Sequence, residues 1–125
     1  MTIHLPLLNQ LKICVPVEKI PDIKKAIQAV KVSDSVLDYA QRLVYATRDD
    51  TDILVGLSPR GAMALLKVAK AWAFMHERGH LIPEDIQQVF MAAVSHRLIP
   101  KQSAYLHAAE TLAQKILVST PVVPR

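Results

Sequence analysis

The segment of residues 59–78 constrains the fold more than any other part of the sequence. With about 100° between successive helix positions, its charged residues all fall in a stripe about 100° wide, and the rest of its circumference is apolar. We therefore expect the central helix of the domain, with methionine and aromatic side chains in the core rather than in a ligand-binding box. Gly79 is expected to end this helix in a left-handed conformation. The charged residues are Arg60, Lys67, Lys70, Glu77 and Arg78.

Further helices are expected on both sides of this segment. Apolar residues recur at helical spacing in residues 21–30, 33–48, 83–97 and 103–118. Three glycines among 125 residues argue against a turn-rich β-fold. The sequence therefore predicts an all-α fold, a small helical bundle of about four to five helices.

The remaining segments are expected to be irregular. Prolines interrupt residues 1–18, which we expect to form an irregular arm or linker that packs onto a helical domain of residues 19–125. The acidic residues 49–52 predict a loop, residues 53–55 a short extended piece, and the prolines of residues 119–125 an extended tail. The helix that begins at Pro83 follows Ile82, so its start is expected to lack a side-chain cap.

The start of the central helix is the strongest candidate for a functional site. Ser58 suits the N-cap, because its hydroxyl can accept a hydrogen bond from a free backbone N–H, and Pro59 suits the first helical position. Arg60 then lies at the positive end of the helix, where an anion is favoured. The local pattern fits either a phosphate contact or a solvated charge at a well-capped start.

Composition argues against several other kinds of chemistry. Cys14 is the only cysteine, so no disulfide and no cysteine-based zinc site are expected. His76 and His80 do not complete a metal ligand set, and His96 and Arg97 suit either an anion contact or compensation of a helix dipole. We expect no metal site and no catalytic residue in this chain alone.

The chain also has no expected membrane or nucleic-acid partner. No apolar run is long enough to span a bilayer and no secretory signal is visible, which predicts a cytoplasmic protein. The net charge of +4 is spread over a mixed surface. DNA binding is disfavoured, because the most regular helix is apolar over most of its surface and offers no polar recognition face.

An ordered series of motifs resembles the C-terminal lid domain of MoxR-type AAA+ ATPases. The resemblance covers residues 32–124 and follows the helix of residues 33–48, the acidic loop and the Ser58-Pro59-Arg60 step. It continues through Ala-Lys-Ala-Trp-Ala at 69–73, Pro-Glu-Asp-Ile at 83–86, Ser-His-Arg-Leu at 95–98 and the end of the chain at 116–124.

The resemblance implies a role for Arg60 as the sensor 2 residue, which reaches the γ-phosphate of ATP bound by an α/β core. Ser58 would cap the helix and orient Arg60. ATP and Mg²⁺ would belong to the parent ATPase, because this chain lacks the Gly-x-x-x-x-Gly-Lys-Ser/Thr motif, and neither is expected to bind the isolated chain.

The same resemblance implies partners and an activity. The partners are the protein's own AAA+ core, further copies of it in a homo-oligomeric ring, and von Willebrand A domain proteins. The activity is chaperone-like remodelling or assembly of client proteins. The alternative is a free-standing helical adaptor for protein interactions that does not depend on nucleotide.

Overall fold

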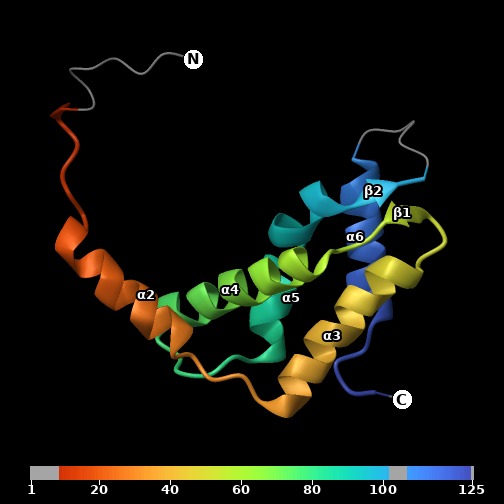
Figure 1. Ribbon diagram of the computed structural model, residues 1–125, viewed down its shortest axis with the longest axis horizontal. Helices are drawn as coiled ribbons and strands as arrows, with labels where there is room; N and C mark the ends of the chain where they lie inside the picture. Colours follow the sequence, from red (N-terminus) through yellow and green to blue (C-terminus); the bar gives the residue numbers. More distant parts are fainter. Residues whose placement is uncertain (1–8, 102–106, 125) are drawn as a thin grey trace.

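The computed structural model describes residues 9–101 and 107–124, which form a mostly helical bundle (Figure 1). The α-helices are α2 (Ile20–Gln28), α3 (Asp34–Asp49), α4 (Pro59–Met75), α5 (Pro83–Val94) and α6 (Ala108–Ser119). Two 3₁₀ turns, η1 (Val17–Lys19) and η2 (Ser95–Arg97), precede α2 and follow α5. The expected helical bundle is confirmed. None of the helices within the described ranges is long and apolar enough to cross a membrane.

A short antiparallel sheet closes one side of the bundle. β1 (Ile53–Val55) pairs with β2 (Ile99–Pro100), so the extended piece expected at 53–55 is confirmed. The sequence did not predict its partner strand. Pro100 has no N–H to donate, which is consistent with a pairing of only two positions.

The core lies where α3, α4, α5 and α6 meet. Its largest fully buried side chains come from all four helices, and burying one such side chain stabilises the fold by about 1.5–3 kcal/mol. Figure 1 shows α4 crossing in front of α5 near the centre, with α3 and α6 on one side and α2 at the far end of α4. The largest members from these helices are Tyr39, Leu43, Leu65, Ile86, Phe90 and Ile116, and Leu57 of the loop before α4 is also fully buried.

Helix α4 is less enclosed than its sequence predicted. Its buried residues are spaced four apart, at Gly61, Leu65, Ala69 and Ala73, and α5 is its most extensive neighbour. Met63, Val68 and Met75 are 57%, 42% and 71% exposed, so the expected core position is wrong for these three side chains. The small residues of the buried stripe allow α5 to approach closely, while α2 and α3 make less extensive contacts with α4.

The end of α4 also differs from the expectation. Glu77, with φ of 59°, takes the left-handed conformation, and no described glycine has a positive φ. The N–H groups of Glu77 and Arg78 return to the carbonyls of Phe74 and Ala73 at 3.0 Å, which is the Schellman arrangement. Gly79 instead accepts a hydrogen bond from the N–H of Lys31 at 3.0 Å. This pairing requires the chain to leave the helix before Gly79 is reached.

The start of α5 is capped from inside the helix. Ile82 supplies no side-chain cap, as predicted, but its N–H donates to Asp85 Oδ2 at 3.0 Å. The guanidinium of Arg78 donates to Oδ1 of the same carboxylate, which is buried. The ion pair therefore joins the end of α4 to the first turn of α5.

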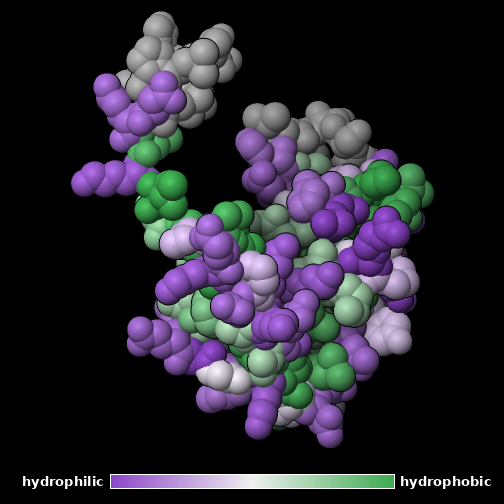
Figure 2. All heavy atoms as spheres, turned by 60° about the vertical axis from the view of Figure 1, so that its left-hand side comes forward, coloured by the Kyte–Doolittle hydropathy of each residue, from purple (hydrophilic) through white to green (hydrophobic). Residues whose placement is uncertain are grey.

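The two ends of the chain behave differently. Leu11, Ile13, Val15 and Val17 are exposed, so the described part of the N-terminal arm does not pack onto the domain as expected. Figure 2 shows this segment extending away from the body with apolar side chains on its surface. The expected start of the last helix at Ser103, with Tyr105 on its buried face, lies outside the described residues.

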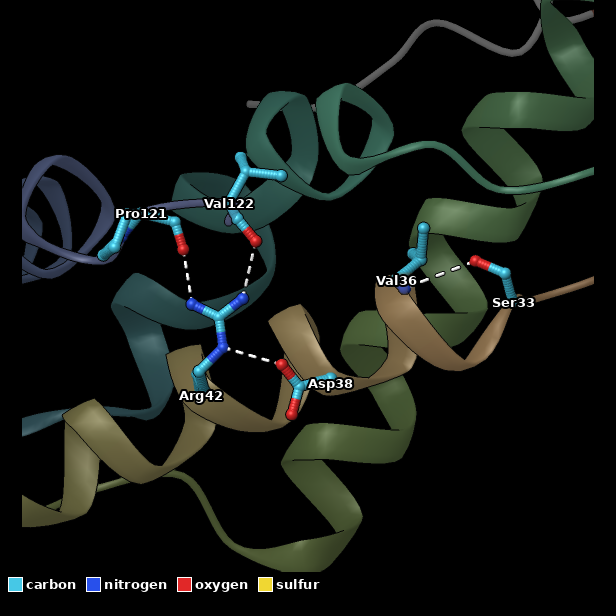
Figure 3. Close-up of polar contacts among 6 residues, drawn as sticks. All are labelled: Ser33, Val36, Asp38, Arg42, Pro121 and Val122. Carbon is cyan, nitrogen blue, oxygen red and sulfur yellow. Dashed lines mark hydrogen bonds and ion pairs between the residues drawn. The ribbon is translucent and has the colours of Figure 1, made fainter. Parts of the chain in front are cut away.

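The C-terminal tail is tied back to α3. Arg42 donates to the carbonyl of Pro121 and, at 2.6 Å, to that of Val122 (Figure 3). Arg42 Nε also donates to Asp38 Oδ2 at 2.9 Å, which is a pairing that a spacing of four on a helix favours. A single guanidinium therefore connects two turns of α3 with a segment 79 residues further along the chain.

Candidate functional site

The start of α4 has the capped geometry that the sequence predicted. Ser58 Oγ accepts from the N–H of Gly61 at 3.0 Å, just as Ser33 Oγ accepts from that of Val36 at 3.3 Å at the start of α3 (Figure 3). Arg60 follows in the first turn of α4 and is exposed. Within the described part of the chain, its side chain has no hydrogen-bond or ion-pair partner, so the guanidinium is available to a ligand or a neighbouring protein surface.

The loop that leads into α4 is bonded to the last turn of α3. The N–H of Leu57 donates to Thr47 Oγ1 at 3.0 Å, and Arg48 Nε donates to the carbonyl of Leu57 at 2.8 Å. Thr47 is fully buried, and its hydroxyl donates to the carbonyl of Val44 at 2.6 Å. We refer to the bonds from Thr47 and Arg48 to Leu57 as the α3–Leu57 contact.

Gly56 is required beside this contact because there is no room for a Cβ, and not because its φ is positive. A Cβ on Gly56 would lie 2.5 Å from the carbonyl oxygen of Thr47, well inside van der Waals contact. The loop therefore lies directly against the backbone of α3. A Cβ on Gly61 would likewise lie 2.9 Å from Cδ2 of Leu57, so a glycine in the first turn makes room for the buried leucine.

A second arginine approaches the same helix start. Arg97 in η2 is exposed, and its Cδ lies 3.5 Å from the position that a Cβ on Gly61 would occupy. Its stem therefore passes the first turn of α4 at Gly61. The sequence indicated only that Arg97 follows a helix end. Its approach to α4 depends on the packing of α5 and η2, which no local pattern records.

Two hollows flank the step from Ser58 to Arg60. A groove of about 330 Å³ lies between α3 and α4 and has exposed Tyr45 and Met63 on its walls. A shallower hollow of about 470 Å³ follows residues 54–59. Arg48 and Pro59 line both hollows. Arg60 directly follows Pro59, so it lies beside a surface that is largely apolar. The groove is completed by Leu37, Ala40, Gln41, Val44, Ala62, Leu65 and Leu66.

The acidic loop after α3 has a structural partner. Lys115 Nζ lies 3.1 Å from Asp50 Oδ2 and 3.3 Å from Asp52 Oδ2. Burial opposes the charged form of Asp50, but hydrogen bonds from the Asp52 N–H and from Lys115 outweigh it, so the pKa of Asp50 lies below its ordinary 3.8. Hydrogen bonds to Asp50 and Asp52 raise the pKa of Lys115 above its ordinary 10.5. These carboxylates therefore hold α6 to the loop.

The histidines do not assemble a metal site in the part of the chain that the structure describes. The ring Nδ1 of His76 lies 2.8 Å from the carbonyl of Trp72, and His80 lies in the bridge to Lys31. The helix ends between these two histidines, at Glu77 rather than at the expected Gly79.

Comparisons with known proteins agree with this geometry. A family model described as the AAA lid domain matches residues 45–116. The uncharacterized protein YeaC of Bacillus subtilis is 32% identical over 102 residues, which are 80% of this chain and 32% of YeaC. Chaperone MoxR1 of Mycobacterium tuberculosis is 26% identical over 97 residues, which are 70% of this chain and 25% of that protein.

A solved structure gives the same result for the fold. The crystal structure of a candidate ATPase of Cytophaga hutchinsonii is similar, with a TM-score of 0.76 and 30% identity, over 86% of this chain and 36% of that one. The chain thus spans about a third or less of the length of the curated relatives it matches. Because the lid family model covers more than half of the chain and the relatives include MoxR proteins, this chain belongs to the AAA lid domain family, as a C-terminal lid of the MoxR type.

Proposed function

We propose that this lid completes an ATP site, with Arg60 as the sensor 2 arginine that contacts the γ-phosphate of ATP bound by an AAA+ core. The observation that carries the proposal is an exposed arginine, with no partner among the described residues, in the first turn of a capped helix. The N–H groups of a helix start and a guanidinium both favour an anion. Ser58 fixes the helix start and so orients Arg60.

The chemistry of a guanidinium suits this role. It offers several donors in a fixed plane, and its charge-assisted hydrogen bonds are roughly twice as strong as those between neutral groups. ATP supplies the phosphoryl group that is transferred to water, and negative charge on its oxygens must be stabilised as transfer proceeds. Arg60 provides a donor for that charge, while Mg²⁺ and the remaining phosphate contacts belong to the core. One helix start with one arginine is too small to hold a nucleotide, so the isolated chain is not a catalyst.

The apolar groove between α3 and α4 supports the same proposal. Tyr45 and Met63 are exposed on the walls of one groove beside Pro59, and contiguous exposed apolar surface often marks a site of protein contact. We assign this surface to contact with the core, so that docking of the core and contact of Arg60 with the phosphate occur together. The parent would act as a ring of such subunits that remodels or assembles client proteins, with von Willebrand A domain proteins as candidate partners.

The test protein is a single chain in which this lid replaces the lid of the Cytophaga hutchinsonii relative, and we call it the joined ATPase. The measurement is its ATP turnover. We expect Arg60→Ala to lower kcat by about a hundredfold, the effect of removing one preorganised donor to a developing charge. Lys67→Ala is the matched control, because it removes an exposed cation from the middle of the same helix and is expected to leave kcat unchanged. Wild-type turnover in Arg60→Ala would contradict the proposal.

The exposed apolar groove also favours one alternative, a protein-interaction adaptor that does not depend on nucleotide. The two functions differ in how the groove and Arg60 are coupled. An adaptor would bind its protein partner equally well with and without ATP, and Arg60→Ala would not alter that affinity. A lid would bind an AAA+ core more tightly when ATP is present, and Arg60→Ala would remove the difference.

A further inference from the structure

We infer that Thr47 and Arg48, at the end of α3, are positioning residues for Arg60, because the α3–Leu57 contact sets the direction in which α4 begins. This inference rests on the proposed role of Arg60. Neither residue is assigned to the phosphate itself. Their effect passes through the backbone of Leu57, three residues before the arginine.

The contact holds both polar groups of the Leu57 backbone. Thr47 Oγ1 accepts from its N–H at 3.0 Å, and Arg48 Nε donates to its carbonyl at 2.8 Å. With both hydrogen bonds in place, Leu57 can neither rotate nor shift along α3 without breaking one of them. The leucine side chain is also buried, which restrains the residue from a third direction.

Little freedom remains between Leu57 and Arg60. Ser58 is held by its cap bond to the N–H of Gly61, and the ring of Pro59 fixes its own φ. The orientation of Leu57 is therefore transmitted to the first turn of α4. Gly56 allows this arrangement, because only a residue without Cβ lets the loop lie against the Thr47 carbonyl.

The two hydrogen bonds differ in burial, so the loss of each is expected to disturb the loop to a different extent. Thr47 is fully buried, so removal of its hydroxyl would leave the Leu57 N–H without a partner away from water, and the loop would move to satisfy it. Arg48 is exposed and its guanidinium also lies 5.8 Å from the Tyr45 ring centre. Water would partly replace a lost Arg48 bond, so the effect of losing it is expected to be smaller.

The first arm of the test uses the 125-residue chain. Thr47→Val keeps the shape of the side chain and removes the hydroxyl, and Thr47→Ser keeps the hydroxyl. Thr111→Val is the matched control, because Thr111 Oγ1 likewise donates to a backbone carbonyl, that of the N-cap residue His107 at 3.1 Å, but is exposed. We expect Thr47→Val alone to accelerate amide hydrogen exchange at Leu57 by at least about tenfold at pH 7, without unfolding α3.

The second arm measures kcat in the joined ATPase. A misplaced reactive group commonly costs about tenfold to a hundredfold, so Thr47→Val should lower kcat in that range while Thr47→Ser restores it. In the Arg60→Ala background, Thr47→Val should cause no further loss, because its effect acts only through Arg60. Arg48→Lys, which keeps the charge and removes the Nε donor, should give a smaller loss that also disappears in that background.

The outcomes separate this inference from the proposed function. If Thr47→Val lowers kcat by the same factor with and without Arg60, the threonine has a general structural role and the inference is wrong, while the role of Arg60 stands. If kcat is unchanged in Thr47→Val but falls strongly in Arg60→Ala, the inference is also wrong and the role of Arg60 stands. If Arg60→Ala itself turns over ATP normally, both the proposed function and the inference are overturned.

Discussion

The ion pair between Arg78 and Asp85 predicts an unequal response to the loss of its two partners. The Asp85 side chain is 1% exposed and that of Arg78 is 29% exposed. Removal of the arginine leaves a buried carboxylate whose remaining hydrogen bond comes from the Ile82 N–H at 3.0 Å. Removal of the aspartate leaves an arginine that can turn toward water. We therefore expect Arg78→Met to destabilise the chain more than Asp85→Ala does.

The expected magnitudes follow from these contacts. Stranding a buried charge costs about 3–5 kcal/mol, and the remaining N–H bond places Arg78→Met at the lower end, about 3 kcal/mol. Asp85→Ala loses a capping bond worth about 1 kcal/mol and part of a charge-assisted bond, for about 2 kcal/mol in total. The double variant loses the same cap but strands no charge, so it should also cost about 2 kcal/mol. One kcal/mol corresponds to about 4 °C in Tm for a chain of this size.

The assay is thermal or urea unfolding of the two single variants and the double variant, followed by circular dichroism. The decisive result is the order of stabilities, in which the double variant is more stable than Arg78→Met alone. Equal costs for the two single variants, with a double variant that shows their sum, would refute the reasoning. That result would mean that neither charge depends on the other, as for two independent surface residues.

Two further contacts give predictions of the same kind. Because the pKa of Asp50 is lowered in the fold, its charge stabilises the fold above pH 3.8, and this stabilisation is lost as the pH falls below that value. Because the pKa of Lys115 is raised, its charge stabilises the fold below pH 10.5, and this stabilisation is lost as the pH rises further. The urea midpoint of Lys115→Met should therefore lie below that of wild type at neutral pH, equal it at the acidic and alkaline extremes of pH, and approach it in 1 M salt. A difference in midpoint that does not change with pH would contradict this prediction. Arg42→Ala should lower the backbone NMR order parameters of the tail around Val122 while Tm changes by less than about 4 °C, because the bonds are exposed. Order parameters equal to those of wild type would show that Arg42 does not hold the tail.

Features that depend on neighbouring residues were predictable from the sequence. The caps at Ser33 and Ser58 and the pair of Asp38 with Arg42 each span three or four residues, and the structure has all of them. The helix that follows each cap was predicted for the same reason, since helical spacing and a cap agree at these positions. The exposed position of Arg60 follows from the narrow charged stripe of its helix.

Features that depend on distant contacts were missed. The bond between Thr47 and Leu57 spans ten residues, and the approach of Arg97 to Gly61 spans thirty-six; neither leaves a periodic pattern in the sequence. Gly79 suited the end of α4 by local rules, but its bond to Lys31 places it elsewhere. The exposure of apolar side chains on α4 could not be foreseen either, because an apolar circumference does not distinguish a residue in the core from one at the surface.

The position of Arg42 in the middle of α3 has a mechanical consequence. The C-terminal tail is bound at Arg42, and the loop leading to Arg60 is bound at the last turn of the same helix, at Thr47 and Arg48. A 16-residue helix of about 24 Å resists bending over that length. A force applied to the tail is thus delivered to the middle of α3, and α3 can pass it to the loop at its last turn for as long as these hydrogen bonds hold.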